Sequence, residues 1–343
     1  MDLADFDYAL PPERIAQQPT PERDAARLLR LPRREGPLAH THVRELPELL
    51  RPGDLLVRNV TRVVPARLRG HKATGGAVEA LLLGALPAAP GRFHALLKLT
   101  GRSRPGAKLR FGPAGAELDA ELVERGAAGQ VVLAFAPDVD PYAIGETPMP
   151  PYIRRDAARP EDAPRYQTVY ARVPGSVAAP TAGLHLSEAL LARLALRGIE
   201  IADLVLHVGP GTFRPLAPEQ LASGILSREA FSLPAETAAH VAAARARGGR
   251  VIAVGTTSAR VLEACATSEG RVEPGAGETD LFLRPGSKFR VVDALLTNFH
   301  LPRSSLLMLV AAFAGRERVL TAYAEAIRAG YRFYSYGDAM LVL

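Results

Sequence analysis

The stretch RVIAVGTTSARVLEACAT, residues 250–267, contains a strand, a polar turn and a helix in direct succession. The run 250–254 is short and apolar, as expected of a strand covered on both faces in a parallel sheet. Residues 258–267 are predicted to form the helix. Ligands of α/β domains bind beyond the carboxyl ends of strands, so the turn Gly255–Ser258 is expected at a binding site.

Helices and strands alternate on both sides of this stretch. A strand is predicted at 54–57. A helix is also predicted, with Ser187 suited to begin it and Gly198 suited to end it. Further helices are predicted at 235–247, 304–314 and 316–328, and further strands at 199–207 and 331–336. Strand-then-helix repetition predicts an α/β domain.

The segment 66–150 has a different pattern. Short strand candidates follow one another about every ten residues, separated by turns that contain Gly or Pro, and no helix intervenes. They lie at 78–86, 93–99, 107–112, 118–124 and 130–136. This spacing predicts a small antiparallel β-barrel. The expected fold is therefore an α/β main domain, formed by residues 1–65 and 151–343, with an inserted barrel domain at 66–150.

Composition sets wide limits on the function. The chain has 343 residues, a net charge of +6 and one cysteine, Cys265. No apolar run of about 18 residues occurs, so no membrane span is expected. The acidic start lacks the apolar segment of a secretory signal, and one cysteine permits no internal disulfide, so a cytoplasmic protein is expected.

Basic residues gather in KLTGRSRPGAKLRFG, residues 98–112, which contains no acid. One interpretation is a solvated surface hairpin. The other is a surface that follows the phosphates of a large RNA.

Several common motifs are missing. The chain has no phosphate-binding GxxxxGK[ST] loop, no HExxH and no GxSxG, and the pair Gly209 and Gly211 lacks a third glycine in register. The chain therefore lacks a Rossmann-type glycine loop, and ordinary methyl transfer is not indicated. No metal site is predicted.

Segments of unusual composition occur at four places. YQTVYARVPGSVAAPTAGLHLS, residues 166–187, combines small residues, hydroxyls and an imidazole without helical or strand periodicity. A similar composition returns at 206–213, 295–310 and 331–341. Such segments contribute little apolar burial, so we expect them, together with residues 253–263, to form one composite active site.

These segments also carry a resemblance to a family. GSVAAPTAGLH (175–185), LHVGPGTF (206–213), VGTTSAR (254–260), TNFHLP (297–302) and FYSYGDAM (333–340) resemble blocks of the S-adenosylmethionine:tRNA ribosyltransferase-isomerases, the QueA family of queuosine biosynthesis. N-terminal blocks such as LRPGDLLVRN (50–59) match in the same order. The family is known for an α/β body with an inserted barrel.

The resemblance implies an unusual reaction. The ribosyl part of S-adenosylmethionine moves onto an aminomethyl-deazaguanine at the wobble position of tRNA and isomerises, giving epoxyqueuosine-tRNA, adenine and methionine. S-Adenosylmethionine is then a co-substrate, and no tightly bound cofactor is expected. The implied partners are tRNAs with a GUN anticodon, and a monomer is expected.

Imidazoles and hydroxyls supply the candidate residues. His185, His207 and His300 are the acid–base candidates because imidazole titrates near neutral pH, and Asp338 would orient a histidine or bind the substrate amine. Each histidine has a structural role as the alternative. The predicted binding residues are Asn59, Arg62, Thr181, Gly183, Gly209, Gly211, Thr212, Gly255, Thr256, Thr257, Ser258, Arg260, Asn298 and Tyr336. Ser258 would open a helix at the methionine carboxylate, with Arg260 as its partner.

Three positions depart from the family pattern. Val60 replaces an Asp, and Gly224 and Ser227 stand where the family has histidines. They motivate one alternative, a related transferase with a different acceptor. A second alternative is a nonenzymatic RNA-binding protein with the barrel as its main module.

Overall fold

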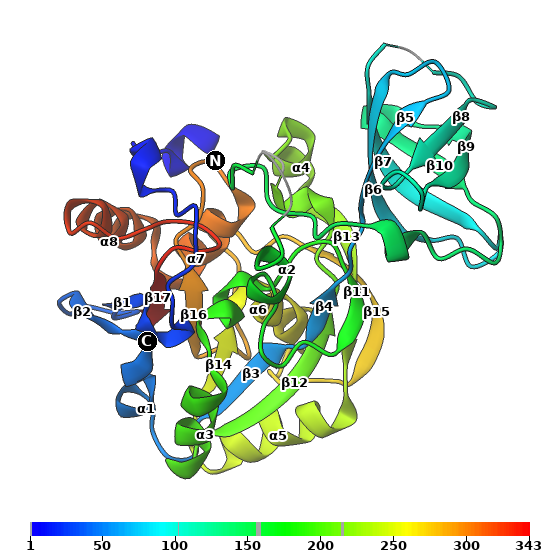
Figure 1. Ribbon diagram of the computed structural model, residues 1–343. Coiled ribbons are helices and arrows are strands. Elements are labelled where there is room, and N and C mark those ends of the chain that lie inside the picture. Colours follow the sequence, from blue (N-terminus) through cyan, green and yellow to red (C-terminus); the bar gives the residue numbers. More distant parts are fainter. Residues whose placement is uncertain (1, 102, 156–158, 214–215) are drawn as a thin grey trace.

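The computed structural model describes residues 2–101, 103–155, 159–213 and 216–343, with the backbone alone at 212 and 213. Figure 1 shows a large body built around a twisted sheet, and a smaller barrel that projects from one side of it. The expected fold class, an α/β body with a small antiparallel barrel, is confirmed.

Nine strands of the described residues form the main sheet. In spatial order they are β15 (Gly275–Leu281), β13 (Ile225–Leu233), β12 (Glu200–Leu206), β3 (Leu55–Asn59), β14 (Val251–Val254), β16 (Ala294–Asn298), β17 (Ala339–Val342), β1 (Arg27–Leu31) and β2 (Ala39–His42). The strands β12, β3, β14 and β16 run parallel, and β17 is antiparallel to β16. The carboxyl ends of the four parallel strands therefore meet the start of β17 at one edge.

Helices cover both faces of this sheet. Along β3, Leu55 and Val57 pack in one apolar cluster with α5 (Ala235–Ala246), α6 (Gly255–Ala264), α7 (Ser305–Ala314) and α8 (Arg316–Arg328). Leu56 packs in the other cluster, with α1 (Leu46–Leu49) and α3 (Glu188–Leu196). Successive side chains of a strand point to opposite faces, so a strand covered on both faces is apolar throughout.

The barrel is closed by six strands of the described residues. They are β5 (Arg67–Lys72), β6 (Ala77–Ala85), β7 (Arg92–Leu99), β8 (Lys108–Phe111), β9 (Leu118–Arg125) and β10 (Gln130–Ala134), in the order β10-β7-β6-β5-β8-β9. Leu68, Leu82 and Phe111 fill its interior. The sequence predicted five of these strands and missed β5, whose RLRGHK is mostly polar. The domain bounds at 66 and 150 stay a prediction.

Two expected elements differ in the structure. The helix expected from Ser258 begins at Gly255. The strand expected at 331–336 is absent there, and β17 follows at 339–342 instead. The alternation in YRFYSY comes from aromatic packing, because Tyr331 and Phe333 both pack on Phe299. The segment also turns, with Tyr334 at φ 71° and the Asp338 carboxylate accepting from the Arg332 N–H at 2.8 Å.

At the opposite edge, Asp54 joins the starts of β3 and β14. Its carboxylate is 1% exposed and accepts the backbone N–H groups of Arg51 and Arg250, at 2.8 and 3.0 Å. It also pairs with the Arg250 guanidinium at 2.6 Å. Removing one partner of a buried pair leaves the remaining polar groups without compensation.

We predict that Asp54→Ala lowers the free energy of unfolding by roughly 3 kcal/mol, measured by urea denaturation. The control is Glu48→Ala, which removes a half-exposed pair with Arg193 and is expected to cost less than ~1 kcal/mol. Equal losses for the two variants would show that Asp54 does not hold the sheet edge.

Candidate active site

A cleft lies at the edge of the sheet where the parallel strands end. This main cleft is lined by the segments 178–182, 255–257, 297–301 and 334–335, with Tyr152, Val208, Ser304 and Leu306. Residues 255–257 follow β14, the segment 297–301 contains the end of β16, and 334–335 lie shortly before β17. The sheet topology therefore gathers four of the five segments that the sequence singled out. From the segment 206–213, Val208 alone lines this cleft.

Asn298, the last residue of β16, forms hydrogen bonds with two other segments that the sequence singled out, 166–187 and 331–341. Its side-chain nitrogen donates to His185 Nε2 at 3.0 Å and to the Tyr334 carbonyl at 3.1 Å. Both partners are acceptors for this nitrogen, which fixes the orientation of the amide. Its Oδ1 is buried and has no hydrogen-bond partner among the described residues. A buried acceptor without a partner is costly, so this oxygen is suited to a ligand N–H or O–H group.

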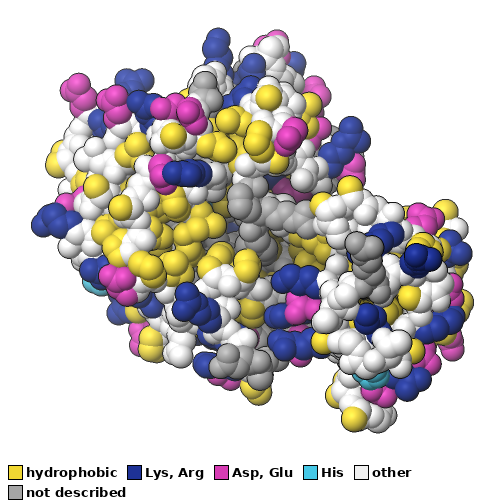
Figure 2. All heavy atoms as spheres, turned by 90° about the horizontal axis from the view of Figure 1, so that it is seen from above, with side chains coloured by type: hydrophobic (Ala, Val, Ile, Leu, Met, Phe, Trp, Pro, Cys, Tyr) yellow, Lys and Arg dark blue, Asp and Glu magenta, His cyan; other side chains and the backbone are white. Residues whose placement is uncertain are grey.

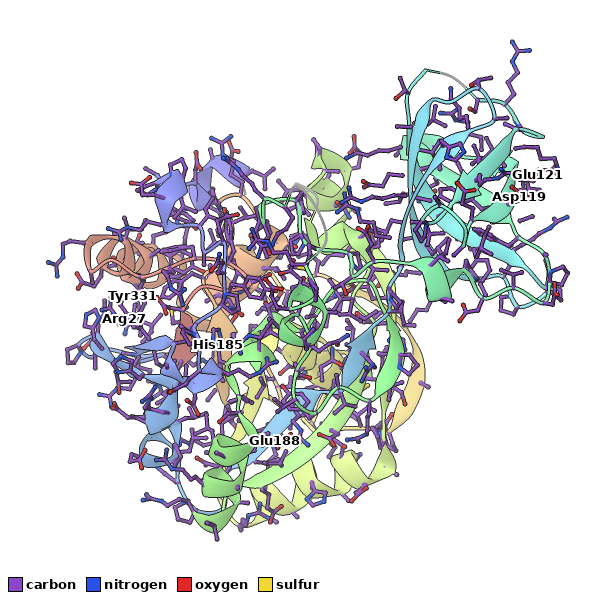
Figure 3. All side chains as sticks on the ribbon, in the orientation of Figure 1. Arg27, Asp119, Glu121, His185, Glu188 and Tyr331 are labelled. Carbon is purple, nitrogen blue, oxygen red and sulfur yellow. The ribbon has the colours of Figure 1, made fainter. Side chains whose placement is uncertain are left out.

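His185, at the end of the short helix η7 (Thr181–His185), is a neutral imidazole at pH 7. Burial lowers its pKa to about 4, and the nearby cations Arg332 and Arg23 act in the same direction. Because Nε2 accepts from Asn298, the ring proton lies on Nδ1. Figure 3 shows His185 inside the body.

His300 lines the main cleft and is also neutral at pH 7. Burial lowers its pKa to about 3. Its Nε2 lies 2.7 Å from Thr297 Oγ1, its backbone N–H donates to Tyr323 Oη at 2.9 Å, and its carbonyl accepts from Tyr8 Oη. Contacts to both backbone and ring fix the orientation of the imidazole.

His207 follows β12 and lies beside the main cleft rather than in its wall. Its Nδ1 is 2.8 Å from Thr61 Oγ1, and the ring packs on Gly175, where an added Cβ would lie 2.8 Å from the ring. Burial lowers its pKa, but the ring is only half-buried. The next residue, Val208, lines the cleft.

The first turn of α6 forms another part of the wall. Gly255, Thr256 and Thr257 line the cleft, and Thr257 Oγ1 has no partner among the described residues. Free N–H groups at a helix start favour an anion. Ser258 is fully buried, and its hydroxyl donates to the Val254 carbonyl at 2.9 Å. It neither opens the helix nor lines the cleft.

Arg260 and Asp338 contact other protein groups. Arg260 is buried, pairs with Glu229, and donates to the Leu281 carbonyl at 3.1 Å. It is therefore not a free partner for a methionine carboxylate. Asp338 accepts the backbone N–H groups of Arg27 and Arg332, at 2.9 and 2.8 Å. Among the described residues, its carboxylate contacts backbone groups and the Arg332 side chain, so it shapes the turn before β17 instead of orienting a histidine.

Two further predicted residues have structural contacts. Asn59 Oδ1 accepts the N–H groups of Thr61 and Leu206, both at 3.1 Å, and its nitrogen donates to the Leu206 carbonyl. Asn59 therefore ties the end of β3 to β12. A Cβ on Gly183 would lie 2.0 Å from Tyr170 Oη, so only glycine fits there.

The remaining predicted residues are spread around the site. Thr181 lines the main cleft, and Tyr336 lines a small pocket behind His185. Arg62 is exposed on β4 (Thr61–Val63). The Gly209 N–H donates to Glu229 at 2.8 Å. The side chain of Thr212 lies outside the described residues.

A second cleft, the side cleft, adjoins the first. It is lined by Gly211, Ser227, Glu229 and Arg260 among others, and Leu306 lines both clefts. Ser227 therefore changes the wall of the side cleft. Gly224 instead ends α4 (Pro218–Ser223) at φ 72°, and Val60 is buried beside β3.

Two tyrosines line the main cleft, and the sequence analysis indicated only one of them. The rings of Tyr152 and Tyr334 lie 4.7 Å apart, and Tyr152 Oη is 2.6 Å from Ser335 Oγ. Tyr334 is expected at the site from its motif. Tyr152 is missed, because no spacing in the sequence connects residue 152 with the end of β16.

Two of the five cations in the basic segment 98–112 pair with acids on the adjacent strand. Lys108 pairs with Glu121 at 2.6 Å and Arg110 with Asp119 at 2.8 Å; both acids are labelled on the barrel in Figure 3. Figure 2 shows Lys and Arg side chains interspersed with Asp and Glu on the visible barrel face. Arg102 lies outside the described residues. These pairs favour the solvated hairpin over a continuous phosphate-binding surface.

The described part of the chain contains no helix that could span a membrane. It also contains no group of three or more His, Cys, Asp or Glu side chains arranged for a metal ion.

Comparisons with known proteins agree on one family. The family model described as "Queuosine biosynthesis protein" matches residues 3–342. S-Adenosylmethionine:tRNA ribosyltransferase-isomerases of Anaeromyxobacter dehalogenans and Moorella thermoacetica are 53% and 51% identical, over 100% of this chain and at least 99% of theirs. A crystal structure of an S-adenosylmethionine tRNA ribosyltransferase from Thermotoga maritima is similar, with 38% identity and a TM-score of 0.57. That match covers 99% of this chain and 100% of the other.

The low pKa values of the two buried histidines predict a pH-dependent stability. The pKa is about 4 for His185 and about 3 for His300 when folded, against ~6.5 when unfolded. Below pH ~6.5 the unfolded chain binds protons that the folded chain excludes. The contribution of these two imidazoles to the free energy of unfolding is fully present above pH ~6.5. It is lost as the pH falls towards their pKa values in the folded chain.

We predict that His300→Gln reduces the slope of unfolding free energy against pH by about 1.4 kcal/mol per unit between pH 6 and 4.5. Urea denaturation over this range measures it. Exposed His42 supplies the control, and His42→Gln should leave the slope unchanged. An unchanged slope in His300→Gln would mean that this imidazole is not held neutral.

Proposed function

This chain belongs to the family of queuosine biosynthesis proteins, and on that premise we propose that it makes epoxyqueuosine in tRNA. It is a tRNA ribosyltransferase-isomerase. The proposed reaction moves the ribosyl part of S-adenosylmethionine onto the aminomethyl-deazaguanine at the wobble position, isomerises it, and releases adenine and methionine. The proposed acceptors are tRNAs with a GUN anticodon, and the enzyme acts as a cytoplasmic monomer.

The reaction places four demands on the site. A base removes a proton from ribose C5′, which the adjoining sulfonium acidifies, and another group assists the departure of adenine. Donors stabilise the developing alkoxide. Water has to be kept away from the reactive intermediates.

The observation that carries the proposal concerns Asn298, which lines the main cleft: its Oδ1 has no hydrogen-bond partner in the described part of the chain. In the proposed complex it accepts a hydrogen bond from the adenine amino group or a ribose hydroxyl. The first N–H groups of α6 receive the methionine carboxylate. Thr257, whose hydroxyl has no partner within the part of the chain that the structure describes, lies at the same helix start.

The neutral imidazoles suit a sulfonium ligand. A protonated histidine in the cleft wall would repel the positive sulfur, and burial keeps His185 and His300 uncharged at pH 7. The faces of Tyr152 and Tyr334 favour a cation or a stacked base. Of the three histidines, His300 is the proposed proton acceptor because its ring is in the cleft wall; geometry takes precedence over basicity in this choice.

A related transferase with a different acceptor is the second candidate. Ser227 supports it, since this departure from the family pattern falls in the wall of the side cleft. S-Adenosylmethionine would then bind while the deazaguanine-bearing tRNA stays unreacted. The nonenzymatic alternative is excluded by the family to which the chain belongs.

Incubating the protein with S-adenosylmethionine and tRNA that carries the aminomethyl-deazaguanine tests the proposal. We expect adenine and methionine in equal amounts, together with a matching gain in mass of the wobble nucleoside. Cofactor binding without any of these products would favour the second candidate. Release of S-adenosylhomocysteine would overturn the proposal.

We predict that His300→Gln lowers kcat/KM by about 10²-fold or more, as loss of a general base does. Binding of S-adenosylmethionine, measured by calorimetry, should weaken far less. His42→Gln serves as the control with unchanged kinetics. Near-normal turnover of His300→Gln would remove this residue from the chemistry.

A further inference from the structure

A small pocket lies behind the wall of the main cleft. This arginine pocket is lined by Thr20, Arg23, Arg165, His185, Ser335 and Tyr336, among others. Ser335 lines both the pocket and the main cleft. His185 lines the pocket, and its Nε2 contacts Asn298 of the cleft. A group bound in this pocket would therefore lie close to a ligand in the main cleft.

Two arginines in this pocket contact backbone carbonyl groups. Arg23 donates to the carbonyls of Leu184 and Pro164, at 3.2 and 2.9 Å. Arg165 donates to the carbonyls of Thr20 and Pro21. Among the described residues, neither forms a salt bridge. Burial lowers the pKa of the Arg23 guanidinium, and the charge of Arg165 lowers it further.

The neighbouring acids contact other groups. Asp162 is buried and holds Arg155 through both carboxylate oxygens, at 3.0 and 3.2 Å. Glu22 pairs with Arg44 at 3.0 Å. The two half-buried guanidiniums of the pocket thus repel one another without compensation from these carboxylates, which is the electrostatic condition of an anion site.

A buried hydroxyl gives an independent indication of a ligand. Tyr336 is 2% exposed, and its Oη has no hydrogen-bond partner among the described residues. Buried polar groups without partners are rare in proteins, so this hydroxyl is suited to donate to a bound acceptor. The negative charge of Asp162 and the positive charges of Arg155, Arg165 and Arg23 all act on this phenol. Of the three arginines, Arg23 and Arg165 line the pocket with it.

We propose that the arginine pocket binds one backbone phosphate of the tRNA, next to the nucleotide whose base enters the main cleft. The inference rests on the proposed function. Two guanidiniums and one hydroxyl match the acceptor oxygens of a phosphodiester. Such a contact sets the position of the RNA and carries no sequence information. A carboxylate has the same chemistry, but the start of α6 is already assigned to the methionine carboxylate.

Salt-dependent binding of the deazaguanine-bearing tRNA, without S-adenosylmethionine, tests the proposal. Losing one phosphate contact reduces the slope of log K against log salt by about 0.7 to 0.9. Arg165→Gln should show this reduction, with binding about tenfold weaker at physiological salt. Tyr336→Phe should weaken binding about threefold without changing the slope, because it removes a neutral donor. Arg328→Gln, on an exposed part of α8, should match the unaltered chain.

Each outcome has a separate meaning. Unchanged slope and affinity in Arg165→Gln and Tyr336→Phe would overturn the phosphate assignment and leave the proposed function standing. Weaker binding of S-adenosylmethionine with an unchanged tRNA slope would also overturn it, and would assign the pocket to the carboxylate. Failure of the unaltered chain to bind tRNA would overturn the proposed function as well. Thermal unfolding of each variant identifies a loss of folding, and Tyr336→Phe removes only one buried hydroxyl.

Discussion

The hydrogen bonds of the Asn298 side chain hold the site together. One amide nitrogen connects the end of β16 with η7 and with the turn before β17. Asn298 and His185 of η7 are more than a hundred residues apart in the sequence. Because both nitrogen contacts are to protein acceptors, the amide oxygen alone is left for a ligand. The same amide also fixes which nitrogen of His185 carries the proton, so it determines both the shape and the hydrogen bonding of the cleft.

Charge is distributed around this cleft in a consistent way. The imidazoles in and beside its wall are kept neutral by burial, and Arg260 is paired with Glu229 in the adjoining side cleft. Polar residues that hold the backbone lie at strand ends: Asp54 at one edge, and Asn59 and Asp338 at the other. In the proposed complex a cationic sulfonium would meet neutral groups, and the arginines of the arginine pocket would lie behind the wall.

The sequence predicts the fold well because periodicity and turn residues are local signals. The apolar run of β14 and the evenly spaced strands of the barrel follow directly from them. The prediction of a strand at 331–336 was wrong, because the aromatic packing of Tyr331 and Phe333 produces the same alternation as a strand. At the site, motif composition indicates the segments of the main cleft, but not what each side chain contacts. The ion pair of Arg260, the backbone bonds of Asp338 and the place of Tyr152 depend on contacts between distant segments.

The proposed reaction requires that the main cleft hold the sulfonium nucleoside against Asn298. A crystal structure with S-adenosylmethionine tests it directly. We expect the adenosyl group within hydrogen-bonding distance of Asn298 Oδ1, with the methionine carboxylate at the first N–H groups of α6. A ligand seated in the side cleft, with Asn298 Oδ1 still unpartnered, would contradict it.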